Sequence, residues 1–188
     1  MTTKPIKPST AKAIDAITLL MADHKTVKAL FKEFDKLAKD DDADEQKEAL
    51  VQKICDELTV HVQVEEEIFY PAVRAAIEDD DLLDEAEVEH ASAKDLIAQL
   101  QQMLPEDNLY DAKVKVLSEY IDHHVKEEED EMFPKARKSD LDLRVLGRTM
   151  AARKEALVED LEMPEADVPP PPRAKAANGA KRATKAGT

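Results

Sequence analysis

Apolar residues recur at helical spacing along five segments of the chain. In the first segment they stand three and four positions apart, as Ile17, Leu20, Leu30 and Phe31 illustrate. This spacing places them on one face of a helix. The segments with this pattern span residues 10–40, 44–77, 82–103, 109–138 and 140–161. The pattern therefore predicts five amphipathic helices, each with one face to bury.

Residues that start, stop or bend helices lie where these segments meet. Thr10 is suited to cap the first helix, and Asn108 to cap the fourth. Pro105 is expected to end the third helix, because proline lacks an amide hydrogen and cannot continue a helix. Pro71 lies inside the second segment and is expected to kink its last turns.

The connections between the first four helices are short, so consecutive helices should be antiparallel. The sequence therefore predicts an all-α fold, an up-down-up-down four-helix bundle with an additional C-terminal helix, over residues 10–162. Residues 1–9 are polar and predict a flexible N-terminal arm. Residues 163–188 are rich in Pro, Ala and Lys. This tail is expected to be disordered, because it cannot bury enough apolar surface to offset its ordering entropy.

Composition and charge limit the compartment and the partners. The chain has three Gly and no Trp, and 37% of its residues are charged, which is typical of a helical protein. A formal net charge of −15 argues against nucleic acid or an anionic membrane as a partner of the folded core, although the tail beyond Asp167 is basic. A single cysteine, Cys55, and the lack of a signal peptide or membrane-length apolar run predict a soluble cytoplasmic protein. Cys55 is expected to be a small buried apolar residue.

An eleven-residue phrase occurs twice, at 61–71 and 124–134. Each copy begins with a His, has a Glu four residues later and another Glu next to it, and ends in an aromatic residue followed by Pro. A lone His, His24 or His90, precedes each copy at a similar distance. An internal repeat of this kind indicates that the chain is built from two similar halves.

The polar residues of the repeat lie on faces that should be buried. His61 and Glu65 are four residues apart and share a helix face with Leu58 and Ile68. An unpaired carboxylate in that environment is costly and tends to take up a proton. A bound cation would keep the glutamate ionised and the histidine neutral. Glu66 and Glu129 each stand five residues after a repeat His and are expected to point away from this face.

A metal site explains the whole set better than separate explanations do. A single inward His is more often a hydrogen-bonded core residue, and one His-x-x-x-Glu pair is common on surfaces. Here each of four helices carries one inward His, and the repeat adds two inward Glu. The candidate metal ligands are His24, His61, Glu65, His90, His124 and Glu128. Imidazole and carboxylate donors suit iron, manganese or zinc, and six ligands are too many for one tetrahedral zinc.

These residues resemble a known family, the hemerythrin-like proteins with an HHE cation-binding domain, over about residues 12–138. The resemblance rests on His24, His61-x-x-x-Glu65-Glu66, Glu89-His90 and His124-x-x-x-Glu128-Glu129. It implies a four-helix bundle with two irons per chain, joined by an oxo or hydroxo group, with manganese or zinc as lesser alternatives. It also implies that His24 and His61 bind one iron, that His90 and His124 bind the other, and that Glu65 and Glu128 bridge them.

The chain departs from the oxygen-carrying hemerythrins, which have a fifth His on the third helix. The positions four residues either side of the third-helix His hold Ala86 and Lys94. Glu87, Tyr120 or water could take the vacant position. His123 is expected to lie near the ligands or on the surface.

An under-ligated metal pair predicts a protein that binds or senses a small ligand such as O2, NO or peroxide. One alternative is a di-iron enzyme with catalase-like, peroxidase-like or NO-related activity. Another is an iron-responsive or iron-holding interaction module, whose protein partner the sequence does not identify. The aromatic residues Phe69, Tyr70 and Phe133 at the ends of the repeats are expected to pack the helix ends.

Overall fold

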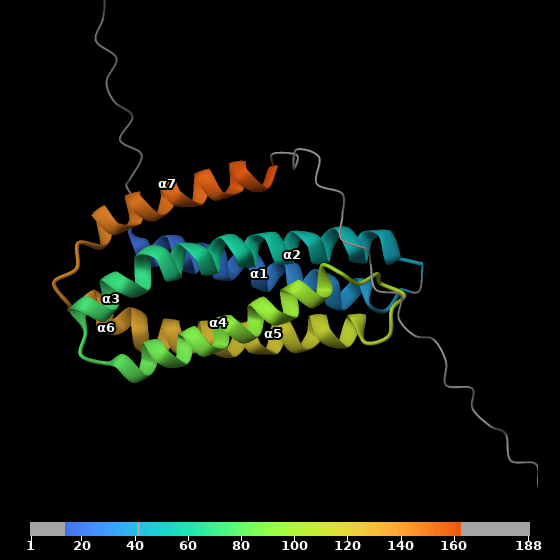
Figure 1. The fold of residues 1–188 in the computed structure, drawn as a ribbon, viewed down its shortest axis with the longest axis horizontal. Helices are drawn as coiled ribbons and strands as arrows, with labels where there is room; N and C mark the ends of the chain where they lie inside the picture. The colour runs from blue at the N-terminus through green and yellow to red at the C-terminus, as the bar shows by residue number, and fades with distance from the viewer. Residues whose placement is uncertain (1–13, 41, 163–188) are drawn as a thin grey trace, which may run out of the picture.

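The computed structural model describes residues 14–40 and 42–162, which form helices and contain no strand (Figure 1). In chain order the helices are α1 (Ala16–Leu37), α2 (Asp44–Val64), η1 (Glu65–Phe69), α3 (Tyr70–Ala76), α4 (Asp80–Leu100), α5 (Tyr110–Glu127), η2 (Glu128–Met132), α6 (Phe133–Lys138) and α7 (Leu143–Glu162). The elements η1 and η2 are π-helices. The predicted arm at 1–9 and the predicted tail at 163–188 lie outside the described residues.

The four long helices α1, α2, α4 and α5 run side by side as a bundle, and α7 lies along the outside of α1 and α2 (Figure 1). The all-α fold class with an additional C-terminal helix is therefore confirmed. The π-helices join α2 to α3 and α5 to α6 without a break, so each repeat forms the end of one long helix. Among the described residues, none of the helices combines the length and the apolar character needed to cross a membrane.

The first helix begins later than predicted. Thr10 lies outside the described residues, and Ile14 and Asp15 are not helical. Asp15 caps α1 instead, because its carboxylate accepts a hydrogen bond of 2.9 Å from the backbone amide of Thr18.

The expected cap at Asn108 is wrong. The residue before α5 is Leu109, which has φ 74° in the left-handed region and makes no side-chain capping bond. The loop is closed from within by Asp107, whose carboxylate accepts a hydrogen bond of 2.9 Å from the amide of Leu104. The chain thus enters α5 through a tight turn, without a polar capping side chain at the residue before the helix.

At the predicted kink, a π-helix ends at Phe69, two residues before Pro71. The amide of Tyr70 bonds to the carbonyl of Glu65, five residues back, and the amide of Phe133 bonds to that of Glu128 in the same way. Proline then stands in the first turn of α3 and of α6, where its missing amide hydrogen is tolerated. Each π-helix therefore accommodates the Pro of its repeat without ending the helix.

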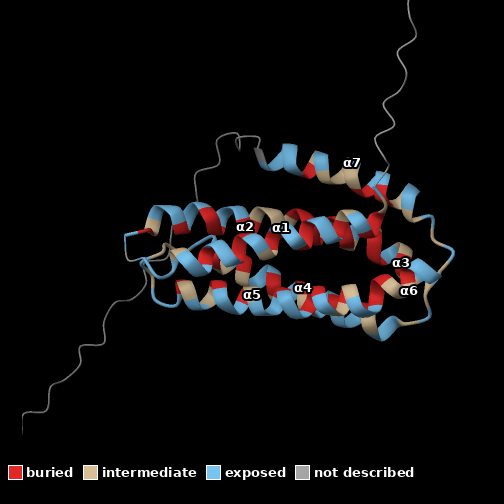
Figure 2. Cartoon of the chain, turned by 180° about the vertical axis from the view of Figure 1, so that it is seen from behind, coloured by how far each residue is buried: buried red, intermediate tan, exposed pale blue. Residues whose placement is uncertain are grey.

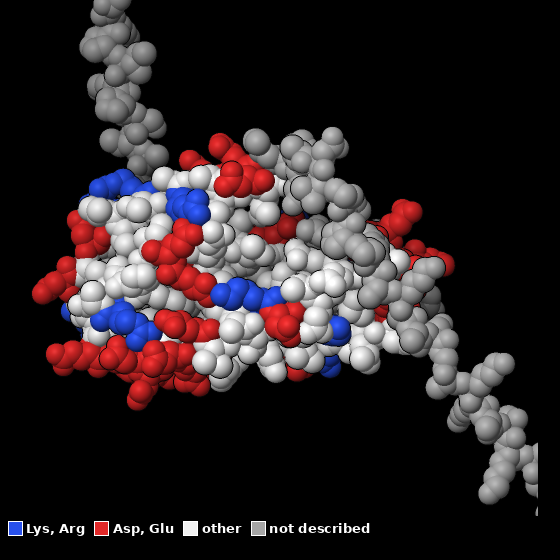
Figure 3. All heavy atoms as spheres, viewed as in Figure 1, with Lys and Arg blue, Asp and Glu red and all other residues white. Residues whose placement is uncertain are grey.

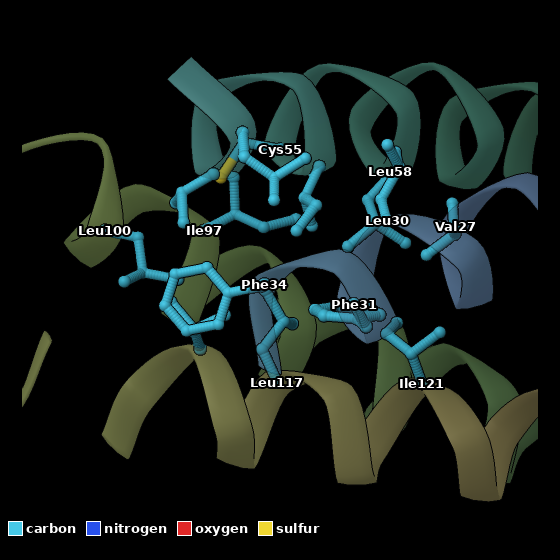
Figure 4. Packing of buried hydrophobic residues seen from close by; sticks show 14 of the residues in the cluster. Val27, Leu30, Phe31, Phe34, Cys55, Leu58, Ile97, Leu100, Leu117 and Ile121 are labelled. Carbon is cyan, nitrogen blue, oxygen red and sulfur yellow. The ribbon is translucent and has the colours of Figure 1, made fainter. Parts of the chain in front are cut away.

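Two apolar clusters fill the bundle, with a polar layer between them. The first cluster contains Val27 and is shown in part in Figure 4, and the second contains Leu20, Val64 and residues of α3, α6 and α7. In α1, His24 stands between Leu20 of one cluster and Val27 of the other. Buried positions accordingly continue along the facing sides of the helices (Figure 2). Cys55 is fully buried in the first cluster, as predicted.

Helix α7 approaches the start of α1 so closely that only glycine fits at the contact. A Cβ atom at Gly147 would lie 2.6 Å from the amide nitrogen of Ala16 and 2.6 Å from the carbonyl oxygen of Ile14. Further along the helix, Met150 and Leu157 are buried in the second apolar cluster. The fifth helix is thus docked by backbone contact and by apolar packing.

We expect Gly147→Ala to lower the free energy of unfolding by about 1–3 kcal/mol, because the added methyl group meets backbone atoms that cannot rotate away. At an unobstructed helical position, the same change stabilises by roughly 0.5–1 kcal/mol. Chemical denaturation measures the effect, with Arg148→Ala at an exposed neighbour as the control. Increased stability of Gly147→Ala would contradict the close contact between α7 and α1.

Candidate metal centre

The six side chains singled out in the sequence lie together in the polar layer. His24 comes from α1, His61 from α2, His90 from α4 and His124 from α5, and the two glutamates open the π-helices. All six are almost completely buried, with exposed fractions from 0% for Glu65 to 5% for His61. The bundle therefore brings four imidazoles and two carboxylates into one interior space.

One group of donors lies on the α1 and α2 side of this space. Atoms of His24, His61, Glu65 and Glu128 all lie within 4.8 Å of one another. Nε2 of His24 is 3.1 Å from Oε2 of Glu128, and Nε2 of His61 is 3.2 Å from Oε2 of Glu65. Two imidazoles and two carboxylates could hold one cation here.

A second group lies beside the first and shares a glutamate with it. Atoms of Glu65, His90 and His124 also lie within 4.8 Å of one another. Nε2 of His90 is 3.4 Å from Oε2 of Glu65, and Nε2 of His124 is 3.7 Å from Oε2 of Glu128. Both glutamates thus reach histidines of both groups, which is the arrangement expected for two adjacent cations with carboxylates between them.

Outer carboxylates fix the orientation of the imidazoles. Nδ1 of His24 is 2.9 Å from Glu129, Nδ1 of His90 is 3.2 Å from Glu66, and Nδ1 of His124 is 2.8 Å from Glu89. An ionised carboxylate can only accept a hydrogen bond, so in each pair Nδ1 carries the proton. In the neutral imidazole, Nε2 then presents a lone pair to the interior, which is the form that binds a metal.

Several inward atoms lack a hydrogen-bond partner. They are Nε2 of His24, both carboxylate oxygens of Glu65 and Oε2 of Glu128. In addition, Nε2 of His90 and Nε2 of His124 are only 3.1 Å apart. Unpaired buried polar atoms and facing lone pairs are unfavourable, and a cation relieves both at once. The donor set therefore fits a metal.

The electrostatics of the metal-free site point the same way. Burial raises the pKa of Glu65, and the charge of Glu128 raises it further. Burial would also raise the pKa of Glu128, but His124 and His24 outweigh this effect and lower it to about 2. Burial lowers the pKa of His61 to about 4, so this imidazole stays neutral. Without a cation, the two central carboxylates cannot both be ionised at low cost.

Glu66 and Glu129 point away from the inner donor atoms, as predicted, but they are not bystanders. Each lies in a π-helix, is about a third exposed and contacts the outer nitrogen of a histidine on another helix. Glu66 reaches His90 of the other half of the chain, and Glu129 reaches His24.

Tyr70 is the site residue that the sequence analysis missed. Its hydroxyl donates a hydrogen bond of 3.0 Å to Oε1 of Glu128 and lies 3.2 Å from Nε2 of His90 and 3.4 Å from Nε2 of His124. Burial and the nearby charge of Glu128 raise the pKa of the phenol well above its usual value, so it keeps its proton. The other two aromatic residues, Phe69 and Phe133, pack in the second apolar cluster as expected.

The residues proposed for the vacant position lie elsewhere. Glu87 forms a 2.9 Å ion pair with Arg74, and Tyr120 is 47% exposed. His123 is on the surface, 3.3 Å from Glu127 and 3.5 Å from Glu89. Unlike these three residues, Tyr70 contacts the donor histidines His90 and His124 directly.

Comparisons with known proteins agree with this site. The sequence model of the family described as the hemerythrin HHE cation binding domain matches residues 15–136, which include all six converging side chains. A crystal structure of a hemerythrin HHE cation binding domain-containing protein from Mycobacterium kansasii is similar, with a TM-score of 0.65 and 26% identity over 78% of this chain and 89% of that chain.

A curated relative shares only part of its length with this chain. The protein from Nostoc sp. named DNA nickase is 30% identical over 115 residues, which are 61% of this chain and 31% of the relative. The chain thus spans about a third of that protein.

We expect Glu65→Gln to stabilise the metal-free protein by about 1–3 kcal/mol, because a neutral amide replaces a buried carboxyl group that lies beside the charge of Glu128. The same change should abolish the stabilisation that added metal gives to the unsubstituted protein. Thermal unfolding with and without ferrous iron measures both effects. Glu131→Gln, at an exposed position of η2, is the control. It should change neither the stability of the metal-free protein nor the stabilisation by metal. A metal-free variant less stable than the unsubstituted protein would contradict this account of Glu65.

Glu129→Ala should weaken metal binding by about 10–100-fold without preventing it at high metal concentration, because the loss of an outer carboxylate frees the His24 ring to rotate. Asp130→Ala, next in the chain and exposed, should bind as the unsubstituted protein does. Titration with ferrous iron under anaerobic conditions compares the two variants. Equal affinities would mean that Glu129 does not orient His24.

Proposed function

The chain belongs to the hemerythrin HHE cation-binding domain family, and from this membership we propose that it is a non-haem di-iron protein that binds or senses a small ligand such as O2, NO or peroxide. The observation that carries the proposal is the pair of adjacent donor groups that share Glu65. We propose His24 and His61 as ligands of one iron, His90 and His124 as ligands of the other, and Glu65 and Glu128 as the carboxylates between them.

The donor chemistry is compatible with iron. Imidazole and carboxylate ligands suit iron, manganese and zinc, whereas thiolate would favour softer metals. The chain's single cysteine, Cys55, lies in the first apolar cluster, and burial raises the pKa of its thiol to about 12, so it supplies no thiolate. When bound, a pair of irons would supply open coordination positions and electrons for a diatomic ligand or peroxide.

A small void beside the histidines suits a ligand of diatomic size. It measures about 10 Å³ and is lined by the four histidines, Asp23 and apolar side chains that include Val27, Leu58 and Ile121. A space of roughly this volume holds about one water-sized molecule. The apolar wall excludes water from one side of the site, so a weakly polar ligand such as O2 or NO would not have to compete with solvent there.

A route from the surface ends at Tyr70. A cavity of about 480 Å³ is lined by Glu66, Tyr70, Pro71, Arg74, Glu87 and Lys94. The phenol ring of Tyr70 separates this cavity from His90 and His124, which its hydroxyl contacts on the inner side. Movement of this one side chain would connect the metal centre with solvent, and a small ligand could enter on the His90 side.

The second candidate function, an enzyme acting on peroxide or NO, is favoured by the protonated phenol of Tyr70. Its hydroxyl points at Glu128 and lies within 3.4 Å of two histidines. A proton donor at this position could protonate a reduced oxygen or nitrogen species, which is the role of a general acid. The third candidate, an iron-holding interaction module, would bind iron without turning over either ligand.

We also propose that the folded core does not bind nucleic acid. Carboxylates are spread over the face shown in Figure 3 and gather where α4 begins, with Asp80 and Asp81 in its first turn. Such a surface repels the phosphate backbone. The relative named DNA nickase gives no contrary argument, because the match covers only 31% of that protein.

We expect aerobically purified protein to contain about two irons per chain, with near-ultraviolet absorption from an oxygen atom between them. Metal analysis and an absorption spectrum of the full chain test this. One metal per chain, or zinc in place of iron, would contradict the di-iron proposal.

We further expect the reduced protein to oxidise in air rather than form a long-lived oxygenated species. The third helix has Ala86 and Lys94 where a fifth His would stand, so fewer protein donors protect the metal pair. Anaerobic stopped-flow mixing with oxygen measures this. A persistent spectrum that reverses when the oxygen pressure falls would indicate an oxygen carrier instead.

A further inference from the structure

Helix α7 lies outside the four-helix bundle and beyond the region that matches the family, yet two of its consecutive residues contact the helices that carry the metal donors (Figure 1). Lys154 contacts Asp23 of α1, and Arg153 contacts Glu67 of η1. Both contacts join segments far apart in the chain. The ion pairs therefore depend on how α7 docks.

Lys154 is one step removed from a proposed metal ligand. Its Nζ atom is 2.5 Å from Oδ1 of Asp23, and the other oxygen, Oδ2, is 3.7 Å from Nδ1 of His61. Asp23 is 9% exposed, so its carboxylate interacts with these two groups rather than with bulk water. One carboxylate thus links the ammonium group of α7 to the imidazole of α2.

His61 has the weakest outer contact of the four histidines. The Nδ1 atoms of the other three lie 2.8–3.2 Å from outer carboxylates. Nδ1 of His61 lies 3.7 Å from Asp23 and has no hydrogen-bond partner. Asp23 is therefore held more closely by Lys154 than by His61, and the position that Lys154 gives its carboxylate sets the distance to Nδ1 of His61.

The link is confined to one of the two donor groups. His90 and His124 are supported by Glu66 and Glu89, which belong to η1 and α4, and in the described part of the chain neither carboxylate forms a hydrogen bond or ion pair with α7. Glu66 is held by Lys94 of α4 instead. A change in α7 should therefore affect the His24 and His61 position and leave the other position largely as it is.

We propose that Lys154 is a positioning residue of the metal centre, which holds Asp23 so that Asp23 orients His61, and that docking of α7 and metal binding at the His24 and His61 position stabilise each other. The proposal rests on the proposed function, in that it requires the site to bind metal. Because such coupling is reciprocal, bound metal should also tighten the docking of α7.

Arg153 provides a matched control. It makes a two-point ion pair with Glu67, at 2.7 Å and 3.0 Å, but both side chains are about a third exposed. A surface pair of this kind contributes little. Arg153→Met and Lys154→Met each remove one cation from the same turn of α7, yet only Lys154→Met removes the contact to Asp23.

The first experiment measures release of ferrous iron from the full-length loaded protein to a chelator under anaerobic conditions. In Lys154→Met, one of the two irons should leave about tenfold faster, as expected when an outer partner of a ligand is lost. The second iron, and both irons in Arg153→Met, should leave at the unsubstituted rate. Lys154→Arg should restore the slow release. Unchanged or slower release in Lys154→Met would overturn the proposal.

A second variant tests the link from the bundle side, without altering α7. In Asp23→Asn, the same iron should be released faster, and combination with Lys154→Met should add little, because both changes break one chain of contacts. If the effects of the two substitutions on the release rate add, Lys154 does not act through Asp23. That result would overturn the proposal, whether or not Lys154→Met also displaces α7.

Hydrogen exchange of residues 143–162 supplies a readout independent of metal release. Exchange should be slower in loaded than in metal-free protein, and Lys154→Met should abolish this difference. If the unsubstituted protein binds no metal, the proposed function fails. If it binds two irons but hydrogen exchange in α7 is the same with and without metal, the proposed function stands and the coupling fails.

Discussion

The constraint on which this structure depends is the burial of four imidazoles and two carboxylates in one dry layer of a helical bundle. The apolar clusters on either side exclude water, so every polar atom of the layer needs a partner from the protein or a bound cation. Outer carboxylates satisfy the Nδ1 side of three histidines. The inner side is left with orphan atoms of Glu65, Glu128 and His24, and these atoms define where a metal fits.

The outer carboxylates connect the two halves of the chain. The acid before each lone His, Asp23 or Glu89, faces the His of the repeat in its own half. The acid after each central Glu, Glu66 or Glu129, faces the lone His of the other half. Each imidazole is therefore oriented by a different helix from the one that carries it. This interlocking makes the layer a property of the assembled bundle, and no single helix could preserve it alone.

The two donor groups differ in what surrounds them. The His90 and His124 side contacts Tyr70, which also lines the surface cavity, so the proposed ligand entry and proton donation would take place on that side. The His24 and His61 side faces Asp23, which contacts Lys154, so an influence of α7 would act on this side. Of two metals that share Glu65, the one at His90 and His124 would be the one that ligands reach. The one at His24 and His61 would be linked to the C-terminal helix through Asp23.

The sequence by itself determined the helices, the repeat and the inward phase of the six donors, because apolar spacing and the His-x-x-x-Glu step are local properties of a helix. It did not determine the π-helices, nor that Glu66 and Glu129 contact histidines of other helices. Their repeated Glu-Glu pairs, and the acid before each lone His, were the available signals. Tyr70 was missed because its contacts with His90, His124 and Glu128 depend on how the helices pack. Only the tertiary structure decided the contacts of Glu129 with His24 and of Lys154 with Asp23, which join residues 105 and 131 positions apart. Such contacts depend on how whole helices pack, and the residue spacing within a single segment does not predict that packing.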